Sequence, residues 1–240
     1  MAAVAAASLL AAVLPASAAA KVLELGDQTG TPLVSPSCPA GVTPAQCTIV
    51  LTRVTALSTY TDGVYLPTEV QKRGRIVAFT VGLSALSSSA STRKKDINYL
   101  NGAYGGDAQV RMTILKQVKR KNKKKRKKDE FRVVAESPVF HVVRYLGSVA
   151  QIPLAQSIKV KPGELVALTT PTWAPALAID LSGQFHYRQS RNHHCDKPPS
   201  VQKAQTTVKS DTTYGCTYGG TRPEYAATEV TEPKPSNSVK

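Results

Sequence analysis

Apolar and polar residues alternate with a period of two in short segments along much of the chain, a pattern typical of half-buried β-strands. At positions 110–114, Val, Met and Ile face one side while Arg and Thr face the other, and positions 131–135 repeat the alternation. Positions 75–83 are almost continuously apolar, which predicts a central strand buried on both faces. Further strands are predicted at 46–55, 157–160, 165–169, 176–179, 185–188 and 225–230.

Turn signals separate these segments, among them Asp62-Gly63, Gly105-Gly106-Asp107 and Pro162-Gly163. The gaps are too short for the helical crossovers of a parallel sheet, and no long helical period competes. We therefore predict an all-β fold, an antiparallel β-sandwich. Positions 84–96 are interpreted as a Ser-rich loop with a basic end, and 102–106 as a turn.

The first twenty residues predict a secretory signal peptide. Positions 2–20 are apolar or small, carry no charge, and end in an Ala-rich stretch that suits signal peptidase cleavage after Ala18 or Ala20. A retained membrane anchor is the alternative, for which the segment is barely long enough. The predicted organisation is a signal peptide at 1–20, one β-sandwich domain at 21–230 and a flexible tail at 231–240. Without the signal peptide, no transmembrane segment is expected.

Four cysteines, Cys38, Cys47, Cys195 and Cys216, agree with export to an oxidising compartment. Three pairings are possible, and the local one, Cys38–Cys47 with Cys195–Cys216, is the simplest. Zinc is the alternative because His193 and His194 precede Cys195. However, no C-x-x-C pair and no second ligand cluster accompany them. We therefore predict two disulfides, with no metal and no cofactor.

The 240 residues are 42% hydrophobic and 20% charged, a globular composition, but the net charge of +15 is unevenly placed. Nine basic residues occupy ten consecutive positions: Lys119, Arg120, Lys121, Lys123, Lys124, Lys125, Arg126, Lys127 and Lys128. Without this basic run, 22 basic residues face 16 acidic ones, a net charge of +6. The run lies between two predicted strands, which makes it a long hairpin loop that is either solvated or bound to an anion.

The charge of the basic run matches a cell-wall polymer, an acidic polysaccharide, a nucleic acid or an anionic lipid. No aromatic residue interrupts the run, so it contains no ring on which a nucleobase could stack. A solvated loop without a partner is the competing interpretation.

Aromatic residues support a second hypothesis, a lectin-like carbohydrate-binding domain. Seven tyrosines lie in or near predicted loops, and Trp173 lies within Pro171-Thr172-Trp173-Ala174-Pro175. Exposed aromatic faces stack on sugars, which makes Trp173 the carbohydrate-binding candidate. The alternative, that Trp173 caps the core beneath a Pro-rich bend, is favoured by the usual burial of large aromatics.

Four segments share a pattern: Asp62-Gly63-Val64 before a strand, the strands at 108–115 and 131–137, and the hairpin at 158–168 that leads into a buried strand. Together they resemble secreted actinobacterial jelly-roll domain proteins, which makes a jelly roll the expected form of the sandwich. The resemblance covers roughly residues 45–230 and implies the fold and an extracellular setting. It carries over no catalytic residue, and the basic run departs from the pattern.

Catalytic patterns are weak. The sixteen carboxylates are dispersed, and no Gly-x-Ser-x-Gly elbow marks a nucleophile for His141 or His186. We therefore predict a secreted or cell-envelope-associated, non-enzymatic module that binds a polyanion through the basic run. The lectin-like domain is the alternative, and a secreted hydrolase is the third.

Overall fold

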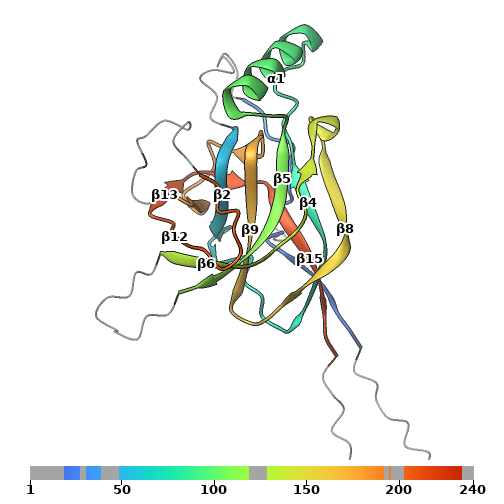
Figure 1. Ribbon diagram of the computed structural model, residues 1–240, viewed down its shortest axis with the longest axis vertical. Coiled ribbons are helices and arrows are strands. Elements are labelled where there is room, and N and C mark those ends of the chain that lie inside the picture. Colours follow the sequence, from blue (N-terminus) through green and yellow to red (C-terminus); the bar gives the residue numbers. More distant parts are fainter. Residues whose placement is uncertain are drawn as a thin grey trace, which may run out of the picture.

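The computed structural model describes residues 19–27, 31–38, 49–118, 129–191, 195 and 203–233. Two antiparallel β-sheets pack against each other, and helix α1 (Ala90–Tyr104) lies at one end of them (Figure 1). The prediction of an all-β, antiparallel sandwich is confirmed. Its jelly-roll connectivity stays a prediction.

The smaller sheet contains four strands and brings the two ends of the described domain together. Its order is β1 (Val22–Leu25), β15 (Tyr225–Thr231), β4 (Gly74–Gly82) and β8 (Val149–Val160). The apolar run at 75–83 therefore forms a central strand, as predicted. Beyond the β1–β15 ladder, the backbone N–H of Thr231 donates to the carbonyl of Lys21 at 2.8 Å.

The larger sheet contains seven strands side by side, and two further short strands pair with them. Its order is β12 (Asp211–Thr213), β6 (Glu130–Glu136), β5 (Gln109–Gln117), β9 (Glu164–Ala174), β2 (Leu51–Thr61), β11 (His186–Gln189) and β13 (Cys216–Gly219). β3 (Val64–Tyr65) pairs with β2, and β7 (Phe140–His141) pairs with β5. A separate pair joins β10 (Leu177–Ala178) to β14 (Arg222–Pro223), and a short 3-10 helix, η2, spans Val143–Tyr145.

The main core lies between the two sheets. Met112 and Ile114 of the larger sheet and Phe79 and Val81 of the smaller one are fully buried there. This confirms the alternation predicted at 110–114, because the apolar positions of β5 point into this core. Burial of these side chains from both sheets supplies the main driving force for their packing.

Part of the outer face of the larger sheet is buried as well, where Gln205 and Tyr214 contact it. A second apolar cluster forms there, in which the ring of Tyr214 packs edge-on against Phe131 at 5.1 Å. Buried hydroxyls in this sheet satisfy one another, since Thr169 Oγ1 lies 2.6 Å from Thr113 Oγ1 and 2.8 Å from Thr55 Oγ1. The polar positions of the alternating pattern therefore form an internal hydrogen-bonded row.

Helix α1 contradicts the prediction of a loop at 84–96 and a turn at 102–106. Ser89 is its N-cap and accepts from the backbone N–H of Thr92, while Gly105, with a φ of 78°, ends it in the left-handed conformation. Of its fifteen residues, all described, Leu100 is the buried one. The helix is therefore specified by its caps and not by an apolar stripe, which is why the hydrophobic pattern misses it.

Several strand boundaries also differ from the prediction. The strand predicted at 46–55 is β2, which starts at Leu51 and continues to Thr61, with a bulge between Thr52 and Val54. β8 begins at Val149, earlier than the predicted 157. No helix among the described residues is long and apolar enough to cross a lipid bilayer.

Candidate functional site

The basic run connects β5 to β6, two neighbouring antiparallel strands of the larger sheet. Their register pairs Gln117 with Phe131, and the N–H of Val118 donates to the carbonyl of Glu130 at 2.9 Å. The nine predicted polyanion-binding residues lie outside the described residues. Their two attachment points, Val118 and Asp129, are therefore held side by side at the end of a paired hairpin, as the sequence predicts.

A pocket of about 270 Å³ adjoins these attachment points, and we call it the tyrosine pocket. Gln117 and Asp129, which flank the basic run, both line it. The remaining walls come from β2, β3, β6, β11 and the turn between β8 and β9. Residues that carry its chemistry are Thr59, Tyr60, Tyr65, Glu69, His186 and Arg188.

One wall of the tyrosine pocket is a row of three rings on adjacent strands. Tyr60 of β2 pairs in register with Tyr65 of β3 and with His186 of β11. The two tyrosine rings lie 5.2 Å apart at 52°, and His186 packs edge-on against Tyr60 at 5.6 Å. Tyr65 is 63% exposed and Tyr60 39%, so both rings keep surface open to solvent.

The turn at Asp62-Gly63 positions this aromatic wall. Both residues have positive φ, 50° and 75°, as a two-residue hairpin turn with right-handed strand twist requires. The Asp62 carboxylate accepts from the hydroxyl of Thr31 at 2.8 Å. The sequence predicted a turn here, and the structure shows that it places the two tyrosines opposite each other.

The polar side of the tyrosine pocket combines donors and acceptors. The Arg188 guanidinium is ion-paired with the Asp129 carboxylate. His186 donates from Nε2 to the carbonyl of Gly183 at 2.8 Å, and its own carbonyl accepts from the Thr59 hydroxyl at 3.1 Å. Glu69 has no hydrogen-bond or ion-pair partner for its carboxylate within the part of the chain that the structure describes.

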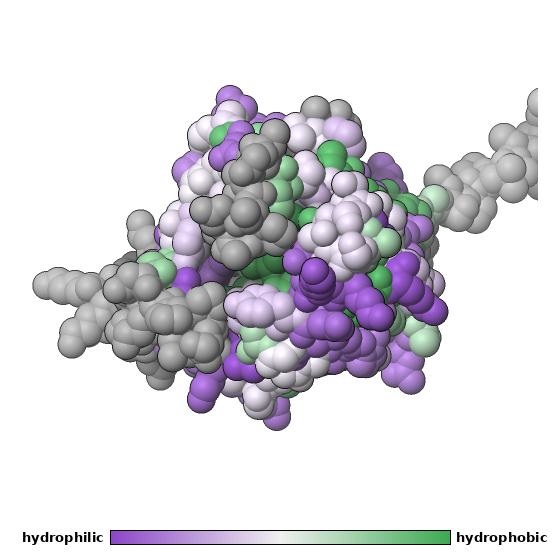
Figure 2. All heavy atoms as spheres, turned by 90° about the horizontal axis from the view of Figure 1, so that it is seen from above, coloured by the Kyte–Doolittle hydropathy of each residue, from purple (hydrophilic) through white to green (hydrophobic). Residues whose placement is uncertain are grey.

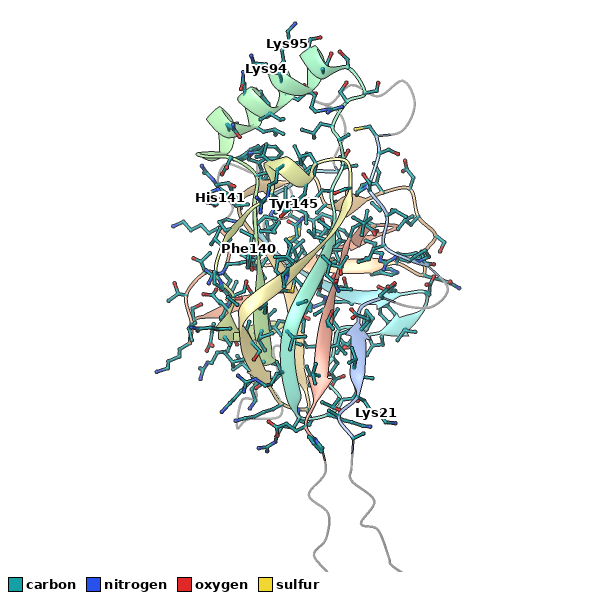
Figure 3. All side chains as sticks on the ribbon, turned by 90° about the vertical axis from the view of Figure 1, so that its right-hand side faces the viewer. Lys21, Lys94, Lys95, Phe140, His141 and Tyr145 are labelled. Atoms are coloured by element: carbon teal, nitrogen blue, oxygen red, sulfur yellow. A yellow bond between two sulfur atoms is a disulfide. The ribbon has the colours of Figure 1, made fainter. Side chains whose placement is uncertain are left out.

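A second, more open cavity of about 740 Å³ lies near α1, on the side shown in Figure 3. It is lined by Phe140, His141, Arg144 and Tyr145, among others. The Asp107 carboxylate oxygens lie 2.8 and 2.9 Å from His141 Nδ1. No hydroxyl among the described residues hydrogen-bonds to this histidine.

Trp173 does not present its ring to solvent. Its side chain is 0% exposed in the main core, and its indole N–H donates to Asn101 Oδ1 at 3.1 Å and to the Gly106 carbonyl at 3.0 Å. The carbohydrate-binding role predicted for Trp173 is therefore corrected: the residue anchors the end of α1 to β9. Burial of the indole on a core strand, with its N–H satisfied, is the physical reason.

The structure contains the disulfide Cys195–Cys216, as predicted. Cys38 is disulfide-bonded too, while Cys47 lies outside the described residues. His193 and His194 of the zinc alternative also lie outside them. Within the described ranges, no three His, Cys, Asp or Glu side chains gather as metal ligands would.

The buried carboxyl groups lie outside both cavities. Burial raises the pKa of Glu224 to about 7, although the guanidinium of Arg222 opposes the shift. Burial also raises the pKa of Glu136 and of Glu229, against the opposing charges of Arg111 and Lys72 respectively. These groups therefore affect stability, as argued below, and contribute nothing to the tyrosine pocket.

Seen from the α1 end, strongly hydrophilic side chains lie along one side of a small apolar hollow (Figure 2). The tyrosine pocket, by contrast, lies where β5 ends and β6 begins, and β5 leads away from α1 (Figure 1). It is thus the described cavity that adjoins the basic run. Comparisons of the chain with protein-family models, with curated proteins and with solved structures find no match.

Proposed function

We propose that the protein is a non-enzymatic module of the extracellular space or cell envelope that binds an anionic polymer through the basic run. One observation carries the proposal: nine cations in ten residues connect two strands that remain hydrogen-bonded up to Val118 and Glu130. A run attached in this way has both ends at one place on the sandwich. We therefore expect the charges to act together on one ligand.

Electrostatics favour a polymeric anion. Nine like charges repel one another, and a ligand with many closely spaced negative groups relieves this repulsion while releasing its own condensed counterions. A small anion neutralises only part of the run. The rest of the chain carries +6, so the binding free energy is concentrated in these ten positions.

The extracellular setting is supported by the sequence and by the covalent structure. Positions 1–20 have the apolar, uncharged character of a signal peptide, and Cys195 is bonded to Cys216. Disulfides form and persist mainly in oxidising compartments. The ligand is therefore sought among envelope polymers and acidic polysaccharides before intracellular nucleic acids.

Retention on a heparin column tests the proposal. A variant with all nine basic residues of the run changed to Gln keeps the loop length and loses its charge. We expect its elution to shift to much lower salt and the slope of log affinity against log salt to flatten. The control variant, Lys94→Gln with Lys95→Gln, removes two positive charges from α1. These lysines lie at one end of the molecule, and Lys21 lies at the other (Figure 3). Equal retention of the nine-Gln variant and the wild type would overturn the proposal.

Binding without catalysis is tested on the same polymer. As a binding module, the wild-type protein should release no new reducing ends from heparin. Release that disappears in a Glu69→Gln or Asp129→Asn variant would replace the binding module with the hydrolase, since both carboxylates line the tyrosine pocket.

The lectin-like alternative is favoured by a different observation. Trp173 is buried, but Tyr60 and Tyr65 keep exposed rings in the tyrosine pocket. A carbohydrate site, if present, is therefore built on these two tyrosines.

A further inference from the structure

We infer that the tyrosine pocket is a binding site for one sugar ring. Combined with the basic run, it makes the ligand an acidic polysaccharide. The acidic character rests on the proposed function, whereas the ring site rests on the geometry of the pocket alone. The two parts can therefore fail separately.

The aromatic wall supplies the apolar half of such a site. The C–H face of a pyranose packs on an aromatic ring, and Tyr65, the outermost ring of the row, is 63% exposed. Tyr60 lies behind it at 52°, so the two rings form a corner and not a flat platform. A puckered ring with C–H groups on its face and its edge fits such a corner better than a flat base does.

The polar side supplies the groups that read hydroxyls. A sugar hydroxyl donates one hydrogen bond and accepts others, so it requires donors and acceptors close together. The pocket offers the Glu69 carboxylate as an acceptor and the Arg188–Asp129 ion pair as adjacent donor and acceptor. Among the described residues no side chain or backbone group engages the Glu69 carboxylate, so none of them competes with a ligand for this acceptor.

The Glu69 carboxylate also bears on which part of a polymer the pocket accepts. Like charges at short range disfavour binding, so we expect an uncharged edge of the sugar ring beside Glu69 and the acidic groups of the polymer outside the pocket. Asp129 is already ion-paired with Arg188. Nucleic acid is the alternative occupant, and it is an outcome of the test.

Size and position agree with a single ring of a longer chain. At about 270 Å³, the cavity lies below the roughly 300–1,000 Å³ of sites for drug-sized ligands. Gln117 and Asp129 line it and also flank the basic run. A polysaccharide with one ring in the pocket would thus pass beside the attachment points of the run.

The test compares three probes by calorimetry on the full secreted protein: a heparin hexasaccharide, inorganic polyphosphate and a single-stranded DNA oligonucleotide. Tyr65→Ala removes the exposed ring, and Tyr99→Ala is its matched control, because Tyr99 is 69% exposed on α1. We expect Tyr65→Ala to weaken hexasaccharide binding about three- to tenfold, the usual effect of one aromatic contact, and to leave polyphosphate unchanged. Tyr99→Ala should change none of the three.

Glu69→Gln provides a second variant, which should affect hexasaccharide binding and polyphosphate binding differently. It should weaken hexasaccharide binding, because a strong acceptor is lost, without weakening polyphosphate binding, because a negative charge is removed.

Equal affinities of wild type and Tyr65→Ala for the hexasaccharide would overturn the ring site. A loss confined to DNA would identify base stacking and also overturn it. If the nine-Gln variant loses polyphosphate while Tyr65→Ala loses nothing, the proposed function holds and this inference fails. If only the pocket variants lower the affinity for the hexasaccharide, and the nine-Gln variant binds every probe like wild type, a sugar site remains and the polyanion proposal fails.

Discussion

The carboxylate of Glu229 lies directly over the backbone of Gly74 on the neighbouring strand. A methyl group on residue 74 would overlap Glu229 Oε1 and come within 2.7 Å of the carbonyl oxygen of Val230. Glu229 is 0% exposed, and neither carboxylate oxygen has a hydrogen-bond partner among the described residues. Gly74 therefore provides the space that this buried acidic side chain occupies between β4 and β15.

The first prediction follows from the raised pKa values of Glu224, Glu229 and Glu136. Since each folded pKa lies above the unfolded one, the folded state binds protons more tightly, and stability increases as pH falls through the folded pKa towards the unfolded value. The penalty is fully present above the folded pKa. For Glu224, with a pKa raised from 4.5 to about 7, it amounts to about 3 kcal/mol.

Urea unfolding of wild type and Glu229→Gln between pH 5 and pH 8 measures this linkage. Gln keeps the shape of the side chain and cannot ionise, so the variant should gain stability relative to wild type as pH rises. Glu24→Gln, at an exposed position of β1, is the control and should leave the profile unchanged. A constant difference between Glu229→Gln and wild type across this range would show that Glu229 is not protonated preferentially in the folded state.

The second prediction concerns Arg222, which holds Gly26 and the start of the segment at 31–34 against the sandwich. Its buried guanidinium donates to the carbonyls of Thr31 at 2.7 Å, Pro32 at 3.4 Å and Gly26 at 3.2 Å, while Glu224 Oε2 accepts from the N–H of Val34 at 3.0 Å. Arg222→Lys keeps the charge but cannot span these acceptors. We expect a loss of about 2 kcal/mol in urea unfolding and earlier proteolysis near residue 31.

A matched control separates this effect from the substitution itself. Arg132 binds Asp211 through Nε at 2.6 Å and Nη2 at 2.8 Å, but on the surface. Arg132→Lys should therefore lower the free energy of unfolding much less than Arg222→Lys does. Equal losses at the two positions would mean that the buried carbonyl contacts contribute nothing specific.

The third prediction concerns the bond between Cys195 and Cys216. It closes a loop with a sequence separation of 21, for which the chain-entropy model gives about 3 kcal/mol. The double variant Cys195→Ala, Cys216→Ala should lower the melting temperature, and added reductant should then have a smaller effect than on wild type. Thiol titration of unfolded, unreduced wild type should find no free thiol; a free Cys47 would contradict the local pairing with Cys38.

How far the sequence predicts the fold depends on the kind of signal at each element. Alternation placed β5 and β6 correctly because one face of each strand enters a core, and β4 was found because both of its faces are largely apolar. α1 was missed because Leu100 is its one buried residue. Ser89 and Gly105, the two caps, were the available signal for it.

The candidate site was predicted only in part, because its members are far apart in the sequence. Tyr60, Glu69, Asp129 and His186 meet only through strand pairing across the larger sheet, which single-sequence patterns do not specify. Trp173 was weighed as a sugar-binding residue because a Pro-rich segment resembles a loop. In the structure most of that segment is the end of β9, which continues to Ala174, and the indole is buried in the core.

The last prediction tests the attachment of the basic run. Replacing residues 119–128 with Asn-Gly leaves Asn, Gly and Asp129 as a three-residue loop between Val118 and Glu130, whose backbones are already paired. The shorter loop costs less closure entropy and removes nine mutually repelling charges, so stability should equal or exceed that of wild type. Heparin retention should fall to the level of the nine-Gln variant, while the Tyr65-dependent part of hexasaccharide binding should persist.

Circular dichroism and urea unfolding report whether the shortened protein folds, and the heparin column reports whether it still binds a polyanion. A shortened protein that fails to fold would mean that residues 119–128 contribute to the sandwich itself, and one that folds and still elutes with wild type would place the polyanion site elsewhere.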